Sequence, residues 1–154
     1  MVSRRLALFA LSLSLLGCRS ATDNSPNFSL SGSWRQSGQF TDAASGDTHI
    51  PLGTYRLTQV GESFSGTGSQ GGVCTSQAHG NFTGPLSDNH QFAVSEGLVH
   101  AMQVSFKTDI CTYQGSFENG NPNRITGTGT CSYTLNNVNY SFTGSWQADR
   151  QSHR

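Results

Sequence analysis

From residue 27 onward, short segments alternate apolar and polar residues and end at clusters of Gly, Asn, Asp and Ser. This alternation is typical of strands that bury one face, and the clusters are typical of turns. The segments cover residues 27–36, 52–59, 62–69, 73–86, 91–95, 100–106, 110–117, 124–135 and 138–148. No stretch of useful length after residue 17 has helical periodicity. The pattern predicts eight or nine short antiparallel strands in a sandwich or an up-and-down barrel.

One hairpin can be placed in register from its residues. A turn centred on Asn121 sets Cys111 opposite Cys131 and Tyr113 opposite Gly129 on one face. The other face then pairs hydroxyl and amide side chains: Ser116 with Thr126, Gln114 with Thr128, and Thr112 with Thr130. A second turn at Asn136–Asn137 sets Tyr133 opposite Tyr140 and keeps the same apolar face. Three strands thus share one apolar and one hydroxyl-rich face, as burial of a single face requires.

The first and last segments predict how the sheet closes. "NFSLSGSWRQ" (27–36) and "NYSFTGSWQA" (139–148) match in residue type at nearly every position. We expect these two strands to pair and to leave no open edge. A two-residue turn at Val60–Gly61 would also set Tyr55 opposite Gly66, a large ring covering a glycine. The predicted fold is therefore all-β, a small antiparallel up-and-down (meander) β-barrel of about eight strands.

The aromatic and glycine pattern, with "SGSW" near its start, resembles the small meander barrels of the avidin and lipocalin type. The resemblance implies a barrel of that kind and the possibility of a ligand inside it. It does not extend to the biotin-site series of avidins or to a second lipocalin motif, so it supports the fold more than the function.

The first residues predict export. Arg4 and Arg5 precede an uninterrupted run of Leu, Ala, Phe and Ser over residues 6–16. A helix of that length rises only about 16 Å, against roughly 30 Å of bilayer hydrocarbon. The charge, the length and the small residue at the end of the run are typical of a secretory leader.

The tetrad Leu15-Leu16-Gly17-Cys18 resembles the lipobox of bacterial lipoproteins. The resemblance implies cleavage before Cys18, acylation of that residue with palmitate-type chains, and anchoring to a membrane of the cell envelope. Arg19, where aspartate would favour retention in the inner membrane, favours the outer membrane. The alternative is an ordinary signal peptide with a chance cysteine. The expected organisation is a signal peptide (1–17), a lipidated cysteine with a flexible tether (18–27), a barrel (28–148) and a polar tail (149–154).

The remaining cysteines and the histidines suggest structural roles. Cys111 and Cys131 are directly opposed, which predicts a disulfide in an oxidising compartment. Cys74 is then left as a thiol or as a competing partner. His49, His79, His90, His100 and His153 lack ligand spacing, so we expect isolated surface histidines and no metal site.

Charge and motifs exclude several functions. The formal net charge is zero and only 12% of residues are charged, so no basic stripe exists to follow a nucleic-acid backbone. "GTGSQG" (66–71) matches G-x-G-x-x-G, but no helix follows to bind a pyrophosphate. No catalytic constellation is found. The sequence thus predicts no enzyme, no catalytic residue, no cofactor and no nucleic-acid partner.

Two functions remain open. The first is a structural or interaction module whose hydroxyl-rich outer face or loops meet a protein or glycan. For either function, we expect the long loop at residues 37–51 to be a lid or a contact loop. The second is a carrier with a small apolar ligand inside the barrel. Its lining would include Trp34, Tyr55, Phe64, Tyr113, Tyr133, Tyr140 and Trp146. A packed interior would favour the first function.

Overall fold

The structure is a computed structural model that describes residues 28–76, 80–82, 90–135 and 137–152. The side chains of residues 73–76, 80–82 and 135 fall outside the description, so the state of the Cys74 thiol does too. The leader, Cys18 and the tether also lie outside it. Within the described ranges, no helix is long and apolar enough to cross a membrane.

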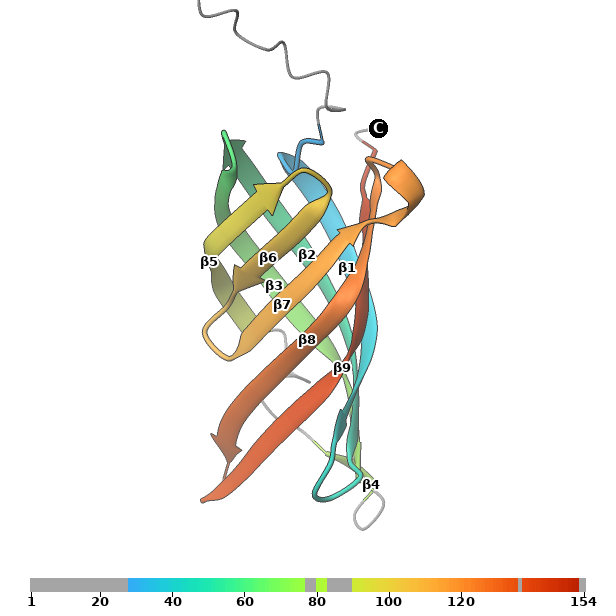
Figure 1. Cartoon of the computed structure of the whole chain (residues 1–154). Helices are drawn as coiled ribbons and strands as arrows, with labels where there is room; N and C mark the ends of the chain where they lie inside the picture. The colour runs from blue at the N-terminus through green and yellow to red at the C-terminus, as the bar shows by residue number, and fades with distance from the viewer. Residues whose placement is uncertain (1–27, 77–79, 83–89, 136, 153–154) are drawn as a thin grey trace, which may run out of the picture.

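Eight strands close into a ring, and a ninth short strand is attached to it (Figure 1). The elements are β1 (Gly32–Asp42), β2 (Thr48–Val60), β3 (Ser63–Ser76), β4 (Gly80–Phe82), β5 (His90–His100), β6 (Gln103–Lys107), β7 (Cys111–Phe117), a 3-10 turn η1 (Glu118–Gly120), β8 (Arg124–Leu135) and β9 (Val138–Arg150). Around the ring each strand is antiparallel to its neighbour in the order β1-β2-β3-β5-β6-β7-β8-β9. Pairing of β9 with β1 closes the barrel. The predicted meander barrel is confirmed.

The predicted pairing of the last three strands is also confirmed. Cys111 faces Cys131 and Tyr113 faces Gly129 between β7 and β8. Tyr133 faces Tyr140 between β8 and β9. The strand β9 continues to Arg150, two residues beyond the expected boundary of the barrel.

The β2–β3 hairpin differs from the prediction by two residues. Val60 pairs with Ser63, so the turn consists of Gly61 and Glu62, and Tyr55 faces Gly68 instead of Gly66. Gly61 has a φ of 62°, which a glycine adopts at the first turn position without steric cost. Because the shift is even, every side chain keeps its face, and a ring still covers a glycine.

The long loop expected at residues 37–51 is wrong, because β1 and β2 run through most of it. The connection between them is limited to residues 43–47. The Asp42 carboxylate ends β1 by accepting hydrogen bonds from the backbone N–H of Ala44 (2.8 Å), Ser45 (3.1 Å) and Ser141 (3.1 Å). These bonds tie the turn to β9.

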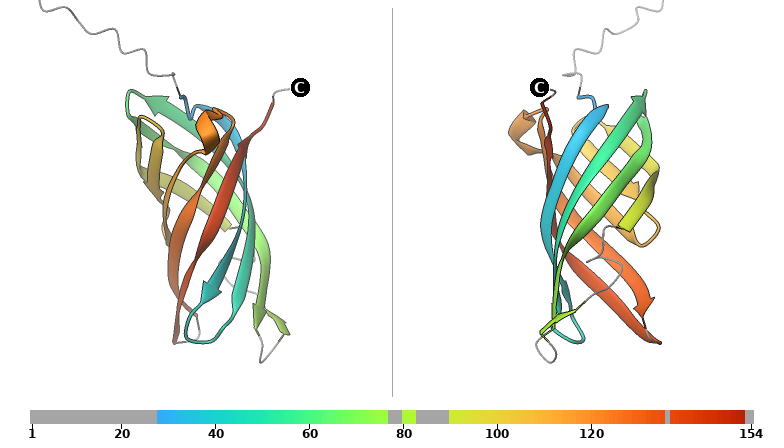
Figure 2. Two further views of the ribbon diagram at one scale, coloured as in Figure 1. Left: turned by 45° about the vertical axis from the view of Figure 1, so that its right-hand side comes forward. Right: turned by 180° about the vertical axis from the view of Figure 1, so that it is seen from behind.

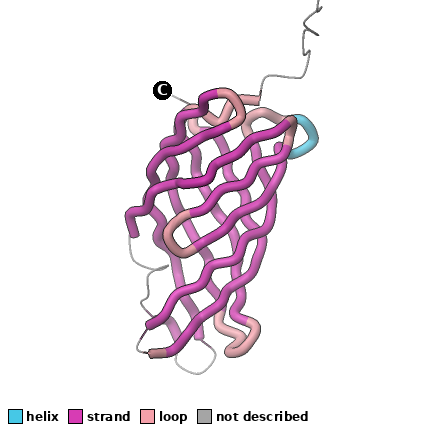
Figure 3. The backbone as a smooth tube through the Cα atoms, turned by 60° about the vertical axis from the view of Figure 1, so that its left-hand side comes forward, coloured by secondary structure: helices cyan, strands magenta, loops and turns pink. Residues whose placement is uncertain are grey.

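The barrel has two unlike ends. Both ends of the described chain, η1 and the β2–β3 and β5–β6 turns lie at one end, here called the closed end (Figures 1 and 2). Residues 43–47 and the β8–β9 turn lie at the other, here called the far end, where β8 and β9 extend beyond β7 (Figure 3).

Residues 28–31 plug the closed end. Leu30 is fully buried, and Phe28 stacks on Phe117 with ring centroids 4.6 Å apart. The Leu30 backbone N–H donates to the Gln59 side chain (2.7 Å), and its carbonyl accepts from the Trp34 indole (2.8 Å). Residues 28–31 therefore fill the closed end of the barrel just before β1 begins.

Candidate functional site

Five of the seven predicted lining residues form one aromatic cluster inside the barrel. Trp34, Tyr55, Phe64, Tyr113 and Trp146 are all buried. Phe106, which was not among the seven predicted lining residues, contacts the rings of four of these five residues. Its ring centroid is 4.7 Å from that of Tyr113, 5.7 Å from Trp146, 5.8 Å from Tyr55 and 5.9 Å from Phe64. Such edge and stacked contacts fix the rings in place.

This cluster leaves almost no free space. Rings and aliphatic side chains from the whole circumference, with Leu30 of the plug above them, enclose a cavity of about 10 Å³. That volume holds one water molecule at most. The aromatic wall is therefore a packed core and offers no preformed hollow for an apolar ligand.

The other two predicted lining residues lie toward the far end. Tyr133 and Tyr140 stack with centroids 5.3 Å apart, and Phe142 stacks on Tyr133 at 6.0 Å. Tyr140 is only partly buried, whereas Tyr133 and Phe142 are buried. These rings form a second group on the inner face of the β8–β9 hairpin.

A buried cluster of polar side chains extends the aromatic core. The Tyr55 hydroxyl donates to Gln36 Oε1, and the Tyr113 hydroxyl donates to Gln70 Oε1 at 3.3 Å. Gln70 Nε2 lies 3.5 Å from His49 Nε2. Among the described residues, Gln36 Nε2 has no hydrogen-bond partner, although Gln36 is fully buried. The Gln36 amide thus leaves two unpaired N–H donors in the cluster.

Burial keeps both phenols of this cluster neutral. Burial raises the pKa of Tyr55 well above its ordinary value, and the neighbouring Tyr113 raises it further. Burial also raises the pKa of Tyr113, although hydrogen bonds with Gln36, Tyr55 and Gln70 oppose the shift. Both phenols therefore stay protonated at neutral pH.

Gln36, His49 and Gln70 were missed because polar residues were assigned to the outer face. The alternation of inward and outward side chains along each strand could have identified them. Gln36 is two residues after Trp34, and His49 is six residues before Tyr55, so both share the inward face of the aromatic residue. The expectation of isolated surface histidines is accordingly wrong for His49, which is fully buried.

The other described histidines are exposed and paired with carboxylates. His90 Nε2 lies 2.6 Å from Asp109, and His100 Nδ1 lies 2.6 Å from Glu62. In the described ranges, no three His, Cys, Asp or Glu side chains gather as metal ligands would. His79 and His153 lie outside the description.

The outer wall carries ordered rows of hydroxyl groups. One row crosses five strands through Thr112, Thr130, Thr143, Thr41 and Thr48, each opposite the next. A second row places Gln114 opposite Thr128, and Thr128 opposite Ser145. We call these eight residues the hydroxyl face. Neighbouring strands stand about 4.8 Å apart, which sets the spacing of the hydroxyls.

A shallow groove of about 510 Å³ follows the hydroxyl face. It is lined by Thr112, Gln114, Thr128, Gly129, Thr130, Thr143 and Gly144. Gly129 and Gly144 line it with their backbone, and every lining side chain is uncharged. The groove offers hydroxyl and amide groups that donate and accept hydrogen bonds without a counter-charge.

A disulfide borders this face. Cys111 and Cys131 are bonded across β7 and β8, with Cα atoms 4.0 Å apart, as the register predicted. Both cysteines are buried, and the adjacent Thr112–Thr130 pair points outward. The bond holds two strands of the hydroxyl face in register.

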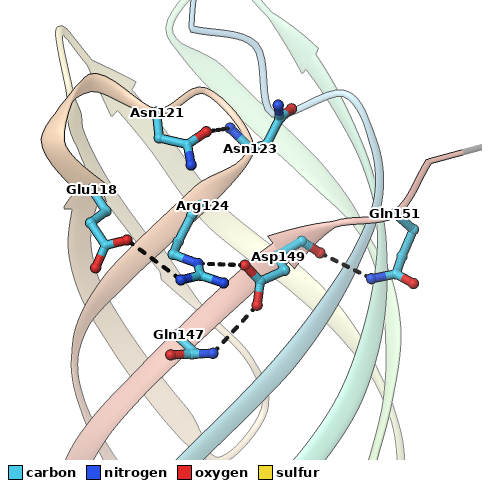
Figure 4. A network of polar contacts seen from close by, with 7 residues as sticks. All are labelled: Glu118, Asn121, Asn123, Arg124, Gln147, Asp149 and Gln151. Carbon is cyan, nitrogen blue, oxygen red and sulfur yellow. Dashed lines mark hydrogen bonds and ion pairs between the residues drawn. The ribbon is translucent and has the colours of Figure 1, made fainter.

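A polar network covers the outside of the closed end (Figure 4). The Arg124 guanidinium donates to Asp149 at 2.6 Å and lies 3.7 Å from Glu118. The Gln147 side chain donates to the same Asp149 carboxylate at 3.3 Å. The hydrogen bond and charge of Asp149 raise the pKa of Arg124, so this arginine stays charged within its pair.

Comparison with known proteins identifies no family. No protein-family model matches the chain, and no curated protein matches its sequence. A solved structure, the S-type phycobiliprotein lyase CPES from Guillardia theta, aligns with a TM-score of 0.42 at 10% identity. The alignment covers 81% of this chain and 90% of the lyase.

The lyase is an enzyme by its title, which contradicts the expectation that this chain is not an enzyme. That exclusion was drawn from the lack of a recognisable motif, and a motif search does not detect a site assembled from distant strands. We therefore no longer exclude catalysis. A TM-score of 0.42 assigns no activity to this chain.

Proposed function

We propose that the chain is a lipoprotein of a bacterial cell envelope, anchored through Cys18, and that its barrel is a binding module that meets its partner on the outer wall. The observation that carries the second part is the contrast in free space. The cavity enclosed by the aromatic cluster holds about 10 Å³, whereas the groove on the hydroxyl face offers about 510 Å³. A partner can therefore bind in the groove on the outer wall while the aromatic core stays packed.

The chemistry of the hydroxyl face favours an uncharged, hydroxyl-rich partner. Thr112, Thr130 and Thr143 each present a donor and an acceptor, and Gln114 adds an amide. A glycan of the envelope has the same kind of groups and no charge for the groove to neutralise. We therefore favour a glycan over a charged protein surface.

Co-sedimentation with isolated cell-wall sacculi tests this proposal. The double variant Thr128→Glu/Thr130→Glu puts two charges into the groove, and we expect it to stay in the supernatant. A matched control, Ser63→Glu/Ser65→Glu, changes two exposed residues of β3 on another wall and should pellet like the wild type. A wild type that does not pellet, or two variants that pellet alike, would contradict a glycan site on this face.

The anchor has its own test. A Cys18→Ala variant should lack acyl mass and accumulate as uncleaved precursor, whereas the wild type should carry acyl chains after cleavage. Cleavage of the wild type without added lipid would indicate an ordinary signal peptide.

If the protein is a carrier, a bound ligand should add to the mass of the folded protein. Native mass spectrometry of the mature protein, compared with its denatured mass, measures any retained ligand. We expect the native and denatured masses to agree, because the cavity within the aromatic cluster is too small for a ligand and the lipid and the disulfide are covalent in both states. An excess that disappears on unfolding would favour the carrier and would require the aromatic cluster to open.

A further inference from the structure

Charge is distributed unequally between the two ends of the barrel. In the described part of the chain, all four arginines lie within about four residues of the closed end: Arg35, Arg56, Arg124 and Arg150. Three carboxylates share that end: Glu62, Glu118 and Asp149. Lys107 and Glu96 lie four residues from this end on β6 and β5 and cancel each other in an ion pair, and the rest of the barrel has Asp42, Asp47 and Asp109. The closed end is therefore net positive, and the remainder is net negative.

Two of the four arginines are available to a partner. Arg124 is paired with Asp149 and Glu118, as Figure 4 shows. Arg150 lies over the Trp34 ring and donates to backbone carbonyls of the plug. Arg35 and Arg56 are exposed and make no ion pair with any described residue. They are diagonal neighbours on the outer face, since Ser33 pairs with Arg56 and Arg35 with Thr54.

A polar groove adjoins Arg56. Its volume is about 310 Å³, and its polar lining consists of Ser33, Thr54, Arg56, Thr67, Ser69, Gln91 and Gln151. No carboxylate lines it. A guanidinium beside hydroxyl and amide donors suits a phosphate, because arginine binds phosphate with two parallel N–H bonds.

The length of the tether limits how far the closed end can lie from the membrane. Phe28 is fixed in the plug against Phe117, and only residues 19–27 separate it from Cys18. Nine residues span at most about 32 Å when fully extended. A barrel anchored at Cys18 thus keeps its basic end within that distance of the lipid headgroups.

We propose that the closed end docks on an anionic phospholipid surface, with Arg35 and Arg56 on lipid phosphates and the far end directed away from the bilayer. This inference rests on the proposed lipid anchor. The acyl chains keep the protein at the membrane, and the arginines set its orientation there. Each arginine near an anionic surface shifts the docked population roughly fivefold.

Energy transfer from the native tryptophans measures this orientation. Trp34 lies at the level of Arg150, and Trp146 lies opposite Gly38 further along β1. The lipidated full-length product is reconstituted in vesicles that contain dansyl-phosphatidylethanolamine. One set is phosphatidylcholine alone and the other adds phosphatidylglycerol. We expect greater transfer from tryptophan to dansyl with phosphatidylglycerol, and a return to the lower value in high salt.

Matched charge removals identify the docking end. Arg35→Gln/Arg56→Gln should lower the transfer to the phosphatidylcholine value while the protein still floats with the vesicles. Lys107→Gln, which removes a cation already paired with Glu96 at 2.6 Å, should behave like the wild type. An unshifted tryptophan emission confirms that each variant is folded, because Trp34 is fully buried.

The outcomes separate the two proposals. Equal transfer on both vesicle types would overturn docking while leaving the anchor intact, as would an Arg35→Gln/Arg56→Gln variant that behaves like the wild type. A wild type that does not float with vesicles would overturn the anchor and the docking proposal with it.

Discussion

The guanidinium of Arg150 lies over the ring of Trp34, with its carbon 4.4 Å from the ring centroid. The same group donates to the carbonyls of Ser31, at 2.6 Å, and Ser29. One side chain near the end of the last strand thus holds the plug, the first strand and the barrel wall together.

We expect Arg150→Ala to lower the free energy of unfolding by about 2 kcal/mol, because a cation–π contact and two charged hydrogen bonds are lost. Urea unfolding followed by tryptophan fluorescence measures the change. Arg56→Ala, an exposed arginine on the neighbouring strand β2, should cost less than about 0.5 kcal/mol. Equal midpoints for the two variants would show that Arg150 does not hold the plug.

The disulfide should stabilise the barrel through the unfolded chain. Cys111 and Cys131 are 20 residues apart, and a loop of that size corresponds to about 3 kcal/mol in the chain-entropy model. Reduction with dithiothreitol should therefore lower the urea midpoint. A Cys111→Ala/Cys131→Ala variant should match the reduced wild type and be unaffected by dithiothreitol. A variant as stable as the oxidised wild type would contradict the prediction.

Closure of the barrel depends on Gly144. A Cβ placed there would lie 1.9 Å from the Gln39 carbonyl oxygen on β1, a backbone atom that cannot turn aside. We expect Gly144→Ala to cost about 3 kcal/mol or more by separating β9 from β1. At Gly129 the nearest atoms belong to the rings of Tyr113, at 2.9 Å, and Phe40, at 3.1 Å. Rings can shift, so Gly129→Ala should cost less.

Ser145→Ala is the control for a substitution on β9, because Ser145 follows Gly144 and its side chain is exposed. It should change the urea midpoint little. If all three variants unfold at the same concentration, close approach of the backbones does not limit this part of the sheet.

The sequence was sufficient to place β7, β8 and β9 because each carries one apolar and one hydroxyl face. A one-residue slip would bury the threonines, so only one register satisfies the pattern. The same reasoning failed for residues 37–51. We expected a polar loop there, whereas the structure continues β1 and β2 through most of this range. Gly38 brings β1 close to β9, because a Cβ there would lie 2.5 Å from the Ser145 carbonyl oxygen.

The polar interior was harder to foresee for a different reason. Burial of Gln36 and Gln70 is favourable only because the Tyr55 and Tyr113 hydroxyls reach their amide oxygens from other strands. Such partners are 19 and 43 residues apart in the chain, and no local pattern reveals them. Strand parity gives the face of each residue but not its neighbours across the barrel.

Protonation of the Asp42 carboxylate should weaken the far end in acid. Burial raises the pKa of Asp42, but hydrogen bonds from the backbone N–H of Ser141, Ala44 and Ser45 more than offset it, and the net pKa is below the ordinary value. The folded state therefore gains stability above the unfolded pKa of about 4 and loses it as pH falls through the lower folded pKa. Asp42→Asn should lower stability at neutral pH and flatten this acid dependence, as urea midpoints between neutral and acidic pH would measure. An unchanged acid slope would show that other carboxylates dominate.

The tyrosines of the polar cluster should make the barrel sensitive to alkali. Because the pKa of Tyr55 is raised in the folded state, the unfolded phenol ionises first. Stability is then fully present below the unfolded pKa of about 10 and is lost as pH rises toward the folded pKa.

Tyr55→Phe removes the hydrogen bond to Gln36 and should cost about 1 kcal/mol at neutral pH. The gap between variant and wild type should shrink as pH rises above about 10, because only the wild type has this phenol to ionise. Phe92→Leu alters the ring packed 5.2 Å from Tyr55 without removing a phenol, so its gap should stay constant with pH. Parallel curves for Tyr55→Phe and Phe92→Leu would show that the Tyr55 hydroxyl is not held neutral by the core.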